Sequence, residues 1–430
     1  MLEQYFGLNA HGTTVRRELL AGLTTFLTMA YIIFVNPQIL AKTGMDINAV
    51  FVATCLAAAF GSLMMGLYAN YPVALAPGMG LNAYFTFVVV LGPTPHTWQV
   101  ALGAVFISGI LFFALSVFKV REWIVNAIPL SMKFGIAAGI GLFLAIIALK
   151  SAGVIVASPA TLVTLGNLKD PPTLLAAVGF LLTVALSYRR VPGAIVIAIL
   201  VVTVLGIPLG LTQFHGIFKA PPSLAPTFLQ MDIAGALKLG LGTIIFAFLF
   251  VDLFDNTGTL IGVAHRAGLL DKEGKLPRLG QALIADSSAA MVGAALGTST
   301  TTSYIESAAG VDAGGRTGLT AATVAVLFLA ALLLSPLAAA VPAYATAPAL
   351  FYVACLMARS LKDLDWDDIS EFVPAVVTTI TIPLSFSIAD GLGLGFIVYA
   401  LAKLLSGRFA DLNPAVVIIA LAFLVRIVLT

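Results

Sequence analysis

Long apolar runs separated by short polar stretches dominate the chain. A helix that spans a membrane needs about 20 mostly apolar residues, and runs close to this length recur throughout, punctuated by glycine, proline and clustered charge. The pattern predicts fourteen membrane segments, at 18–36, 48–69, 73–90, 98–118, 130–150, 172–187, 192–210, 237–262, 280–297, 300–311, 317–335, 343–360, 371–389 and 391–406. A last apolar stretch, 412–429, fits either an interfacial helix or a further crossing.

The composition assigns this chain to the membrane proteins. Sixty per cent of its 430 residues are hydrophobic and ten per cent are charged, whereas about a quarter of the residues of a soluble domain are charged. The chain therefore lacks the polar residues to cover a soluble surface, and we expect a multi-pass protein of the inner or plasma membrane. The net charge of +2 gives no reason to expect a nucleic-acid partner. Cys55 and Cys355 each lie in an apolar run, so we expect no disulfide, metal site or cofactor.

The positive charges indicate the orientation of the segments. With fourteen crossings, ten of the eleven arginines fall on the side of the N-terminus: Arg16, Arg17, Arg121, Arg189, Arg190, Arg266, Arg278, Arg316, Arg359 and Arg408. The opposite side carries only lysines, namely Lys42, Lys150, Lys169, Lys219 and Lys238. Cytoplasmic loops are enriched in positive charge. We therefore predict a cytoplasmic N-terminus and an even number of crossings, with Arg426 left unassigned.

Two of the predicted segments are interrupted. The third, 73–90, contains Pro77 and three glycine or asparagine residues near it, and the tenth, 300–311, begins with a run of hydroxyl residues. They are seven places apart in a series of fourteen, and interrupted segments at matching places indicate an inverted repeat with a binding site at the membrane midplane. The expected fold is an all-α membrane protein with a seven-plus-seven inverted repeat and discontinuous segments 3 and 10. The Asn36–Pro37 pair predicts a break at the end of the first segment.

Acidic side chains inside membrane segments are costly, and they are therefore candidates for function. Asp252 and Asp255 in segment 8 are three residues apart and share a helix face. Glu306 lies in segment 10. Burial away from cations favours the protonated form of a carboxylate, so Asp255 and Glu306 are the candidates for proton coupling. Asp286 fits a cap on a neighbouring helix equally well, and Asp390 is expected to end its helix in an outer loop.

Polar residues continue along segment 8 after the second aspartate. Asn256 and Thr259 interrupt an otherwise apolar helix, as is typical where a helix lines a cavity. We therefore predict that both residues, with Asp252 and Asp255, contact a substrate.

The interrupted segments predict two half-helices that point at the membrane centre. The hydroxyls of residues 298–303, including Thr302, are expected to cap the half-helix that carries Glu306. The counterpart in the first half is expected to begin near Pro77 and Gly78, since proline suits the first helical turn. One turn later, the amide of Asn82 can both donate and accept, which matches the edge of a heterocycle.

Four stretches resemble the AzgA-type hypoxanthine/guanine/adenine permeases of the nucleobase–ascorbate transporter family. They are LTTFLTMAYII at 23–33, APGMGLNAYF at 76–85, FVDLFDNTGT at 250–259 and TTSYIESAAGV at 301–311. The resemblance extends over essentially the whole chain, and the motifs follow one another in the family's order.

The resemblance implies a core domain moving against a gate domain, with short strands before the half-helices. The core would comprise 15–118 and 236–335, and the gate 119–212 and 341–430. It also implies that Glu306 and one of the two aspartates of segment 8 accept N–H groups of the base, with backbone near the half-helices contacting the rest. Thr259 stands where uracil-type relatives carry a histidine. Homodimerisation through the gate is a further implication.

The leading hypothesis is proton-coupled import of a purine nucleobase. The alternatives are an anion carrier of the sulfate-permease type, which shares this architecture but favours a neutral or cationic site, an intramembrane enzyme and a channel. Asp252 and Asp255 lie on one helix, which does not suit an aspartyl dyad. Buried carboxylates at interrupted helices suit a saturable site better than a channel.

Overall fold

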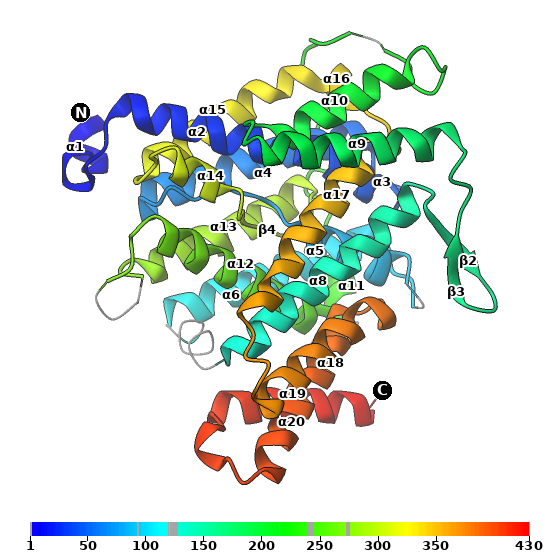
Figure 1. Cartoon of the computed structure of the whole chain (residues 1–430). Helices are drawn as coiled ribbons and strands as arrows, with labels where there is room; N and C mark the ends of the chain where they lie inside the picture. Colours follow the sequence, from blue (N-terminus) through cyan, green and yellow to red (C-terminus); the bar gives the residue numbers. More distant parts are fainter. Residues whose placement is uncertain are drawn as a thin grey trace.

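The computed structural model describes residues 2–92, 94–118, 120, 128–214, 216–238, 244–271 and 276–429, and nearly all of its regular structure is helical (Figure 1). Lys119, Arg121 and residues 239–243 of the eighth predicted segment lie outside the described residues, as does the side chain of Arg426.

The elements follow one another closely along the chain. The first part forms α1 (Leu2–Phe6), η1 (Asn9–His11), α2 (Val15–Met29), α3 (Ile32–Ala41), α4 (Ile47–Met64), η2 (Met65–Ala69), β1 (Leu75–Pro77), α5 (Met79–Ala83), η3 (Tyr84–Val90) and α6 (Trp98–Val117). The middle part forms α8 (Leu130–Ser151), β2 (Ile155–Ser158), β3 (Leu162–Leu165), α9 (Pro171–Tyr188), α10 (Ala194–Gly206), α11 (Ile233–Lys238), α12 (Ile244–Arg266), α13 (Leu279–Leu296), β4 (Thr301–Ser303) and α14 (Ser307–Asp312). The last part forms α15 (Gly318–Ala331), η4 (Leu332–Leu334), α16 (Ser335–Ala340), α17 (Ala343–Ala358), η5 (Arg359–Asp363), α18 (Ile369–Ser385), α19 (Ile388–Leu405), η6 (Phe409–Asp411) and α20 (Pro414–Leu429).

Side-chain caps fix the start of several of these helices. The hydroxyls of Thr14, Thr97 and Ser387 and the carboxylate of Asp46 each accept a hydrogen bond from a backbone N–H in the first turn of α2, α6, α19 and α4. Such caps satisfy donors that the helix itself leaves unpaired. Asp390, expected to end a helix, instead lies in the first turn of α19.

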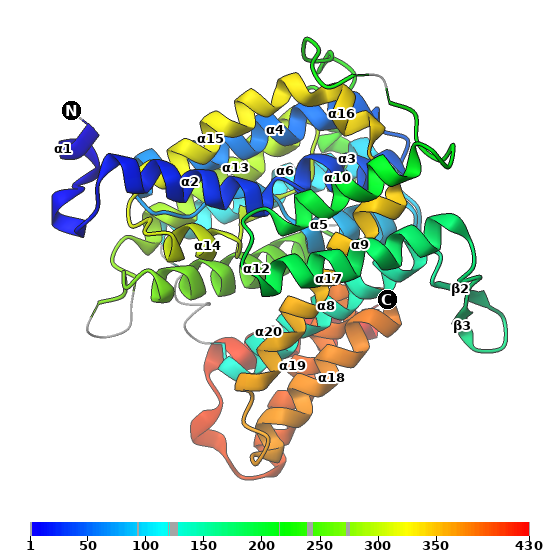
Figure 2. The ribbon, with the colours of Figure 1, turned by 45° about the horizontal axis from the view of Figure 1, so that its top comes forward.

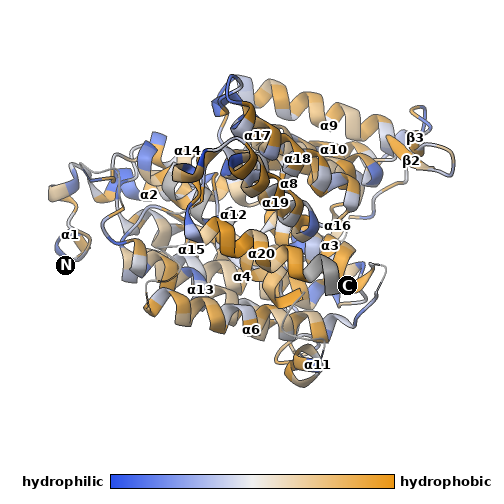
Figure 3. Cartoon of the chain, turned by 90° about the horizontal axis from the view of Figure 1, so that it is seen from below, coloured by the Kyte–Doolittle hydropathy of each residue, from blue (hydrophilic) through white to orange (hydrophobic). Residues whose placement is uncertain are grey.

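Nine helices within the described residues are long and apolar enough to cross a membrane, and shorter apolar helices accompany them. On α9, the side chains of Leu174, Val178 and Leu181 all face outward, Leu181 with 67% of its surface exposed. Spacings of three and four residues put them on one stripe of the helix. Figure 3 shows hydrophobic residues along the helices and hydrophilic residues gathered at helix ends and loops. Such outward apolar stripes require lipid as their solvent.

The first predicted segment is broken earlier than its sequence indicated. The α2 helix ends at Met29 and α3 starts at Ile32, whereas Pro37 lies inside α3. At the junction Phe34 N–H donates to the carbonyl of Tyr31, a tighter spacing than the α-helical one. The predicted break at Asn36–Pro37 is therefore wrong, and the true break lies beside Tyr31.

An unpredicted β-hairpin lies between α8 and α9. Strands β2 and β3 pair antiparallel, with Ile155 opposite Leu165 and Ser158 opposite Leu162. Figure 1 places this hairpin and the N-terminus at opposite ends of the molecule.

The spanning helices pack in two groups. In one, α4 packs on α13 and α15, α2 on α15 and α14, and α6 on α13; Figure 2 shows α2, α4 and α15 side by side. In the other, α8 packs on α17 and α18, α9 on α10 and α17, and α18 on α19. Glycines permit close approach within the second group: a Cβ at Gly135 of α8 would lie 2.5 Å from the carbonyl oxygen of Ala375 in α18. Small residues of this kind let membrane helices approach closely.

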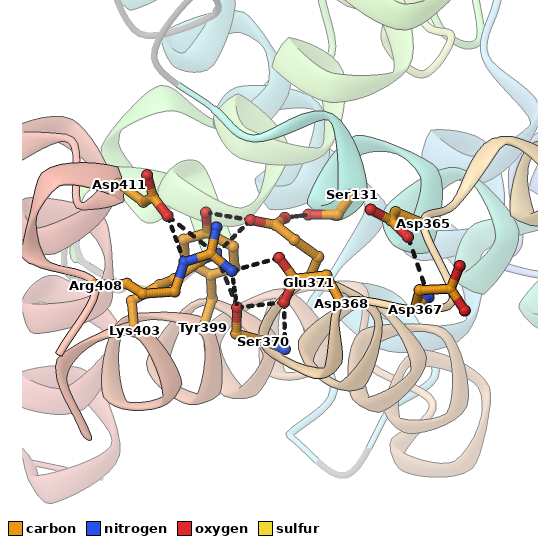
Figure 4. A network of polar contacts seen from close by, with 10 residues as sticks. All are labelled: Ser131, Asp365, Asp367, Asp368, Ser370, Glu371, Tyr399, Lys403, Arg408 and Asp411. Atoms are coloured by element: carbon orange, nitrogen blue, oxygen red, sulfur yellow. Dashed lines mark hydrogen bonds and ion pairs between the residues drawn. The ribbon is translucent and has the colours of Figure 1, made fainter. Parts of the chain in front are cut away.

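A polar network joins the second group at one end (Figure 4). Lys403 lies in the last turn of α19 with none of its surface exposed. Its Nζ is 2.6 Å from Oε1 of Glu371 and 2.9 Å from the hydroxyl of Ser370, both on α18. Glu371 also accepts hydrogen bonds from Ser131 of α8 and Tyr399 of α19. One carboxylate therefore ties three helices together around a buried ammonium.

The outer part of this network holds the loop that leads to α20. Arg408 pairs with Asp368, the N-cap of α18, and its Nε lies 2.7 Å from Oδ2 of Asp411. Hydrogen bonds from Ser370 and Arg408 lower the pKa of Asp368 to about 2. From this loop α20 packs against α19, and the ring of Phe423 lies edge-on to Phe246 of α12.

Candidate functional site

Two short buried strands, β1 and β4, pair with each other inside the molecule. We call this pairing, with the residues next to it, the β1–β4 crossing. Leu75, Ala76 and Pro77 of β1 pair antiparallel with Ser303, Thr302 and Thr301 of β4. The N–H of Gly78 extends the ladder to the carbonyl of Thr300, at 2.9 Å. All residues of both strands are buried. Backbone groups at membrane depth must be paired within the protein, and these two interrupted segments satisfy that requirement with each other.

Each strand leads into a short helix. After Gly78, the N-cap, α5 begins at Met79 and continues into η3; after β4, α14 begins at Ser307. The stretches predicted to be interrupted, 73–90 and 300–311, therefore each contain a strand followed by a short helix. Two details differ from expectation: Pro77 belongs to the strand instead of the first helical turn, and the hydroxyls of residues 301–303 lie in β4 without capping α14. The N-cap position of α14 is occupied by Glu306 itself.

Gly78 is the point where three predicted site residues meet. A Cβ built on it would lie 2.7 Å from Cγ2 of Thr302 and 3.6 Å from Oδ2 of Asp255. The first distance is too short for a real contact, so the crossing requires glycine here. The carboxylate of Asp255, on α12, therefore lies beside Gly78, where β1 ends and α5 begins.

Enlarging this glycine is expected to destabilise the crossing. Gly78→Ala should lower the free energy of unfolding by about 2 kcal/mol, in the range of overpacked cores, because its methyl overlaps that of Thr302. Thermal unfolding of purified protein in detergent measures the change. Adding Thr302→Ser removes the opposing methyl, so the double variant should recover most of the loss. Equal losses in the single and double variants would contradict this contact.

The Glu306 side chain is held by the first span. The phenol of Tyr31 donates to its Oε1 at 2.5 Å, and the hydroxyl of Thr28 donates to its backbone carbonyl at 3.4 Å. Tyr31 is completely buried, whereas Glu306 remains partly exposed. Sequence reasoning missed Tyr31, although a phenol within an apolar run needs a polar partner and was a usable signal.

The two aspartates of α12 occupy different surroundings. Asp252 is completely buried, whereas Asp255 is partly exposed beside Gly78. The α12 helix that carries Asp255 packs against β4 and α14, at whose N-cap Glu306 lies, and Asp286 of α13 is completely buried. Among the residues that the structure describes, no ion pair involves Asp255 or Glu306; the pairs lie elsewhere, as between Arg266 and Asp312.

A buried amide network supports the half-helix of the first half. Asn82 of α5 donates from Nδ2 to Oδ1 of Asn36 at 3.1 Å. Asn36 in turn donates to the hydroxyls of Thr54 and Thr298, each at 2.8 Å. Both asparagines are completely buried. Asn36 is thus a link between α3, α4, α5 and the segment before β4, a role that its sequence position beside Pro37 did not indicate.

Several polar atoms near the crossing have no hydrogen-bond partner within the described part of the chain. They are Oδ1 of Asn82, both amide atoms of Asn256 and the hydroxyl of Thr302. Thr259 lies one turn after Asp255 and is partly exposed. These atoms, the carboxylate oxygens of Asp255 and Glu306 and the first N–H groups of α5 can accept hydrogen bonds from a small polar molecule or donate hydrogen bonds to it.

Comparison with known proteins identifies the family of this chain. The family model described as Permease family (Xan_ur_permease) matches residues 16–429. The chain is 58% identical over 428 residues to the putative permease MJ0326 of Methanocaldococcus jannaschii, covering 99% of this chain and 98% of that protein. It is 53% identical to the adenine permease AdeP of Escherichia coli and 46% identical to the guanine/hypoxanthine permease PbuG of Bacillus subtilis, with at least 96% of each chain covered.

Solved structures share the architecture at low sequence identity. The transmembrane domain of the cyanobacterial bicarbonate transporter BicA matches with a TM-score of 0.69 and 18% identity, covering 88% of this chain and 96% of that domain. At this identity the likeness concerns the fold alone. The family match extends over nearly the whole sequence, and with it the chain is assigned to the permease family of membrane transport proteins, not to a class of enzymes.

Proposed function

We propose that the protein is a secondary active transporter that imports purine nucleobases. The observation that carries the proposal is the placement of Glu306 and Asp255 at the β1–β4 crossing, without an ion pair to any described cation. The full-length similarity to proteins named adenine and guanine/hypoxanthine permeases supports a purine as the substrate.

The chemistry of a purine base matches these groups. A purine is flat and uncharged, and its edge alternates N–H donors with ring-nitrogen or carbonyl acceptors. Carboxylate oxygens of Glu306 and Asp255 accept from such N–H groups, and charge-assisted hydrogen bonds are about twice as strong as neutral ones. The N–H groups at the start of α5, after Gly78, suit the acceptors. Asn82, Asn256, Thr259, Thr302 and Asp252 supply the remaining polar groups of the proposed site.

The proposed transport cycle moves one group of helices against the other. The core would comprise 15–118 and 236–335, and the gate 119–212 and 341–430, each half of the chain giving seven segments of an inverted repeat. Packing supports this division, because α2, α4, α6, α13 and α15 pack together and α8, α17, α18 and α19 pack together. The two groups meet where α5 contacts α8, at which a Cβ on Gly80 would lie 2.8 Å from Cγ2 of Ile140. The site would lie where the two groups meet. A cytoplasmic N-terminus and a homodimer formed through the gate remain predictions.

We further propose that a proton accompanies the base. Asp255 lies on α12, which packs against α14, and Glu306 is the N-cap of α14; within the described residues neither carboxylate forms an ion pair, so taking up a proton relieves the cost of an unpaired negative charge. In liposomes with an acidic exterior, labelled adenine, guanine or hypoxanthine should accumulate and the interior should acidify with it. A protonophore, which dissipates the pH gradient, should abolish the accumulation, and without a base the interior should acidify only at the rate of passive proton leak. Accumulation that leaves internal pH unchanged and ignores the imposed gradient would contradict proton coupling.

The shared fold of BicA keeps an anion carrier as a second candidate. An anion would meet the negative field of Asp255 and Glu306, which opposes its binding. The purified protein should therefore be stabilised against heat by purines and unaffected by bicarbonate or sulfate. Stabilisation by either anion, with none by a purine, would favour the second candidate.

A further inference from the structure

A single side chain outside the predicted site controls one oxygen of the Glu306 carboxylate. The phenol of Tyr31 donates to Oε1 at 2.5 Å, and within the described part of the chain no other side chain hydrogen-bonds this carboxylate. A second tyrosine, Tyr304, lies two residues before Glu306, yet its hydroxyl donates to the carbonyl of Pro77 at 2.6 Å. The two tyrosines therefore have different tasks: Tyr304 links the strands, and Tyr31 contacts the carboxylate.

The backbone break places this phenol. Because α2 stops at Met29 and α3 begins at Ile32, Tyr31 lies at the junction, and its completely buried ring packs within the apolar core. The same span contributes Thr28, whose hydroxyl donates to the backbone carbonyl of Glu306. The first span thus holds Glu306 at both its side chain and its backbone.

We propose that Tyr31 is a positioning residue for the purine site: its hydrogen bond to Oε1 fixes the plane of the Glu306 carboxylate and leaves Oε2 to accept an N–H of the base. This inference rests on the proposed function. Tyr31 is completely buried while Glu306 is partly exposed, so in this proposal the phenol supports the carboxylate and the carboxylate contacts the base. A fixed carboxylate loses less conformational freedom when it binds, which increases affinity.

Tyr31→Phe tests the proposal, because it removes the hydroxyl and keeps the ring. We expect the dissociation constant for adenine or hypoxanthine to rise about tenfold, because the freed carboxylate must then be ordered when the base binds. The unfolding temperature without ligand should change little. Tyr5→Phe is the matched control, since Tyr5 donates its hydroxyl to the carbonyl of Leu67 at an exposed position. The control should bind like the unaltered protein.

An infrared measurement separates positioning from a general structural effect. The carboxyl band of Glu306 is identified as the one lost in Glu306→Gln, and it should shift in Tyr31→Phe without any ligand. An unchanged band, or an unchanged dissociation constant, would overturn the proposal. If Tyr31→Phe does not fold, incorporation of a fluorinated tyrosine at position 31 keeps ring and hydroxyl, alters donor strength, and should also shift the band.

The two readouts distinguish this inference from the proposed function. If the unaltered protein binds no purine, the proposed function fails. The infrared band still decides whether Tyr31 sets the state of Glu306: a shift supports the positioning role for whatever ligand the site takes, and no shift overturns it.

Discussion

Glu306→Ala protein is expected to bind hypoxanthine, guanine and adenine about 100-fold more weakly than the unaltered protein, while remaining folded. The variant removes the carboxylate at the N-cap of α14, which we propose accepts an N–H group of the base. It also leaves the buried phenol of Tyr31 without its hydrogen-bond partner. Losing a hydrogen bond to a charged group costs about 1.5–3 kcal/mol, and about 2.7 kcal/mol corresponds to 100-fold in affinity. Equilibrium binding of labelled bases to detergent-solubilised protein measures the loss.

Asp312→Ala provides the matched control for this experiment. It removes a carboxylate from the other end of α14, where Asp312 forms a bidentate, exposed pair with Arg266. Purine binding should be unchanged in this variant. If Glu306→Ala bound purines normally, the site would have to lie elsewhere, and the proposed roles of Asp255 and Gly78 would fall with it.

Glu371→Gln is expected to destabilise the protein by about 3 kcal/mol, the cost of removing one partner from a buried ion pair. Lys403 is completely buried and has its Nζ 2.6 Å from Glu371; the other nearby carboxylate, that of Asp411, is 3.6 Å away. The variant also weakens the bonds from Ser131 and Tyr399 that join α8, α18 and α19. Unfolding by sodium dodecyl sulfate titration in mixed micelles measures the change.

Two further variants show whether the cost comes from the isolated ammonium. Glu371→Gln combined with Lys403→Met removes both charges and should recover most of the stability, since a buried pair replaced by uncharged side chains is often tolerated. Asp312→Ala breaks an exposed pair instead and should cost less than about 1 kcal/mol. An unfolding curve of Glu371→Gln that matched the unaltered protein would contradict the importance of the pair.

The chain shares its fold with BicA at low sequence identity, whereas it matches proteins named adenine and guanine/hypoxanthine permeases over its full length. The fold alone therefore does not specify the substrate. In this chain the two interrupted segments pair through β1 and β4, and we propose that the groups at this crossing determine which molecules bind there. We propose that those groups include Glu306 and Asp255, which would suit N–H donors and oppose anions. Substrate choice would then be a property of a few side chains, and single substitutions can test it.

Sequence alone determined the class of protein and the residues of the crossing. Apolar runs near 20 residues and the scarcity of charge required a membrane protein, since no other solvent accepts that surface. The interrupted segments around Gly78 and Glu306 were recognisable because each apolar run is short or broken by glycine, proline or hydroxyl residues, at matching places in the two halves. The strands β1 and β4 followed only from the family resemblance, because three residues are too few to show a periodicity.

Only the tertiary structure decided which side chains meet. That Asp255, and not Asp252, reaches Gly78, that Tyr31 holds Glu306, and that Lys403 is buried against Glu371 all depend on segments far apart in the chain. The break beside Tyr31 was also hidden, because Pro37 is the stronger local signal and yet packs inside a helix. The local sequence pattern indicates which segments are apolar enough to lie in lipid and where a helix is interrupted. Contacts between segments arise from tertiary packing, which no single stretch of sequence encodes.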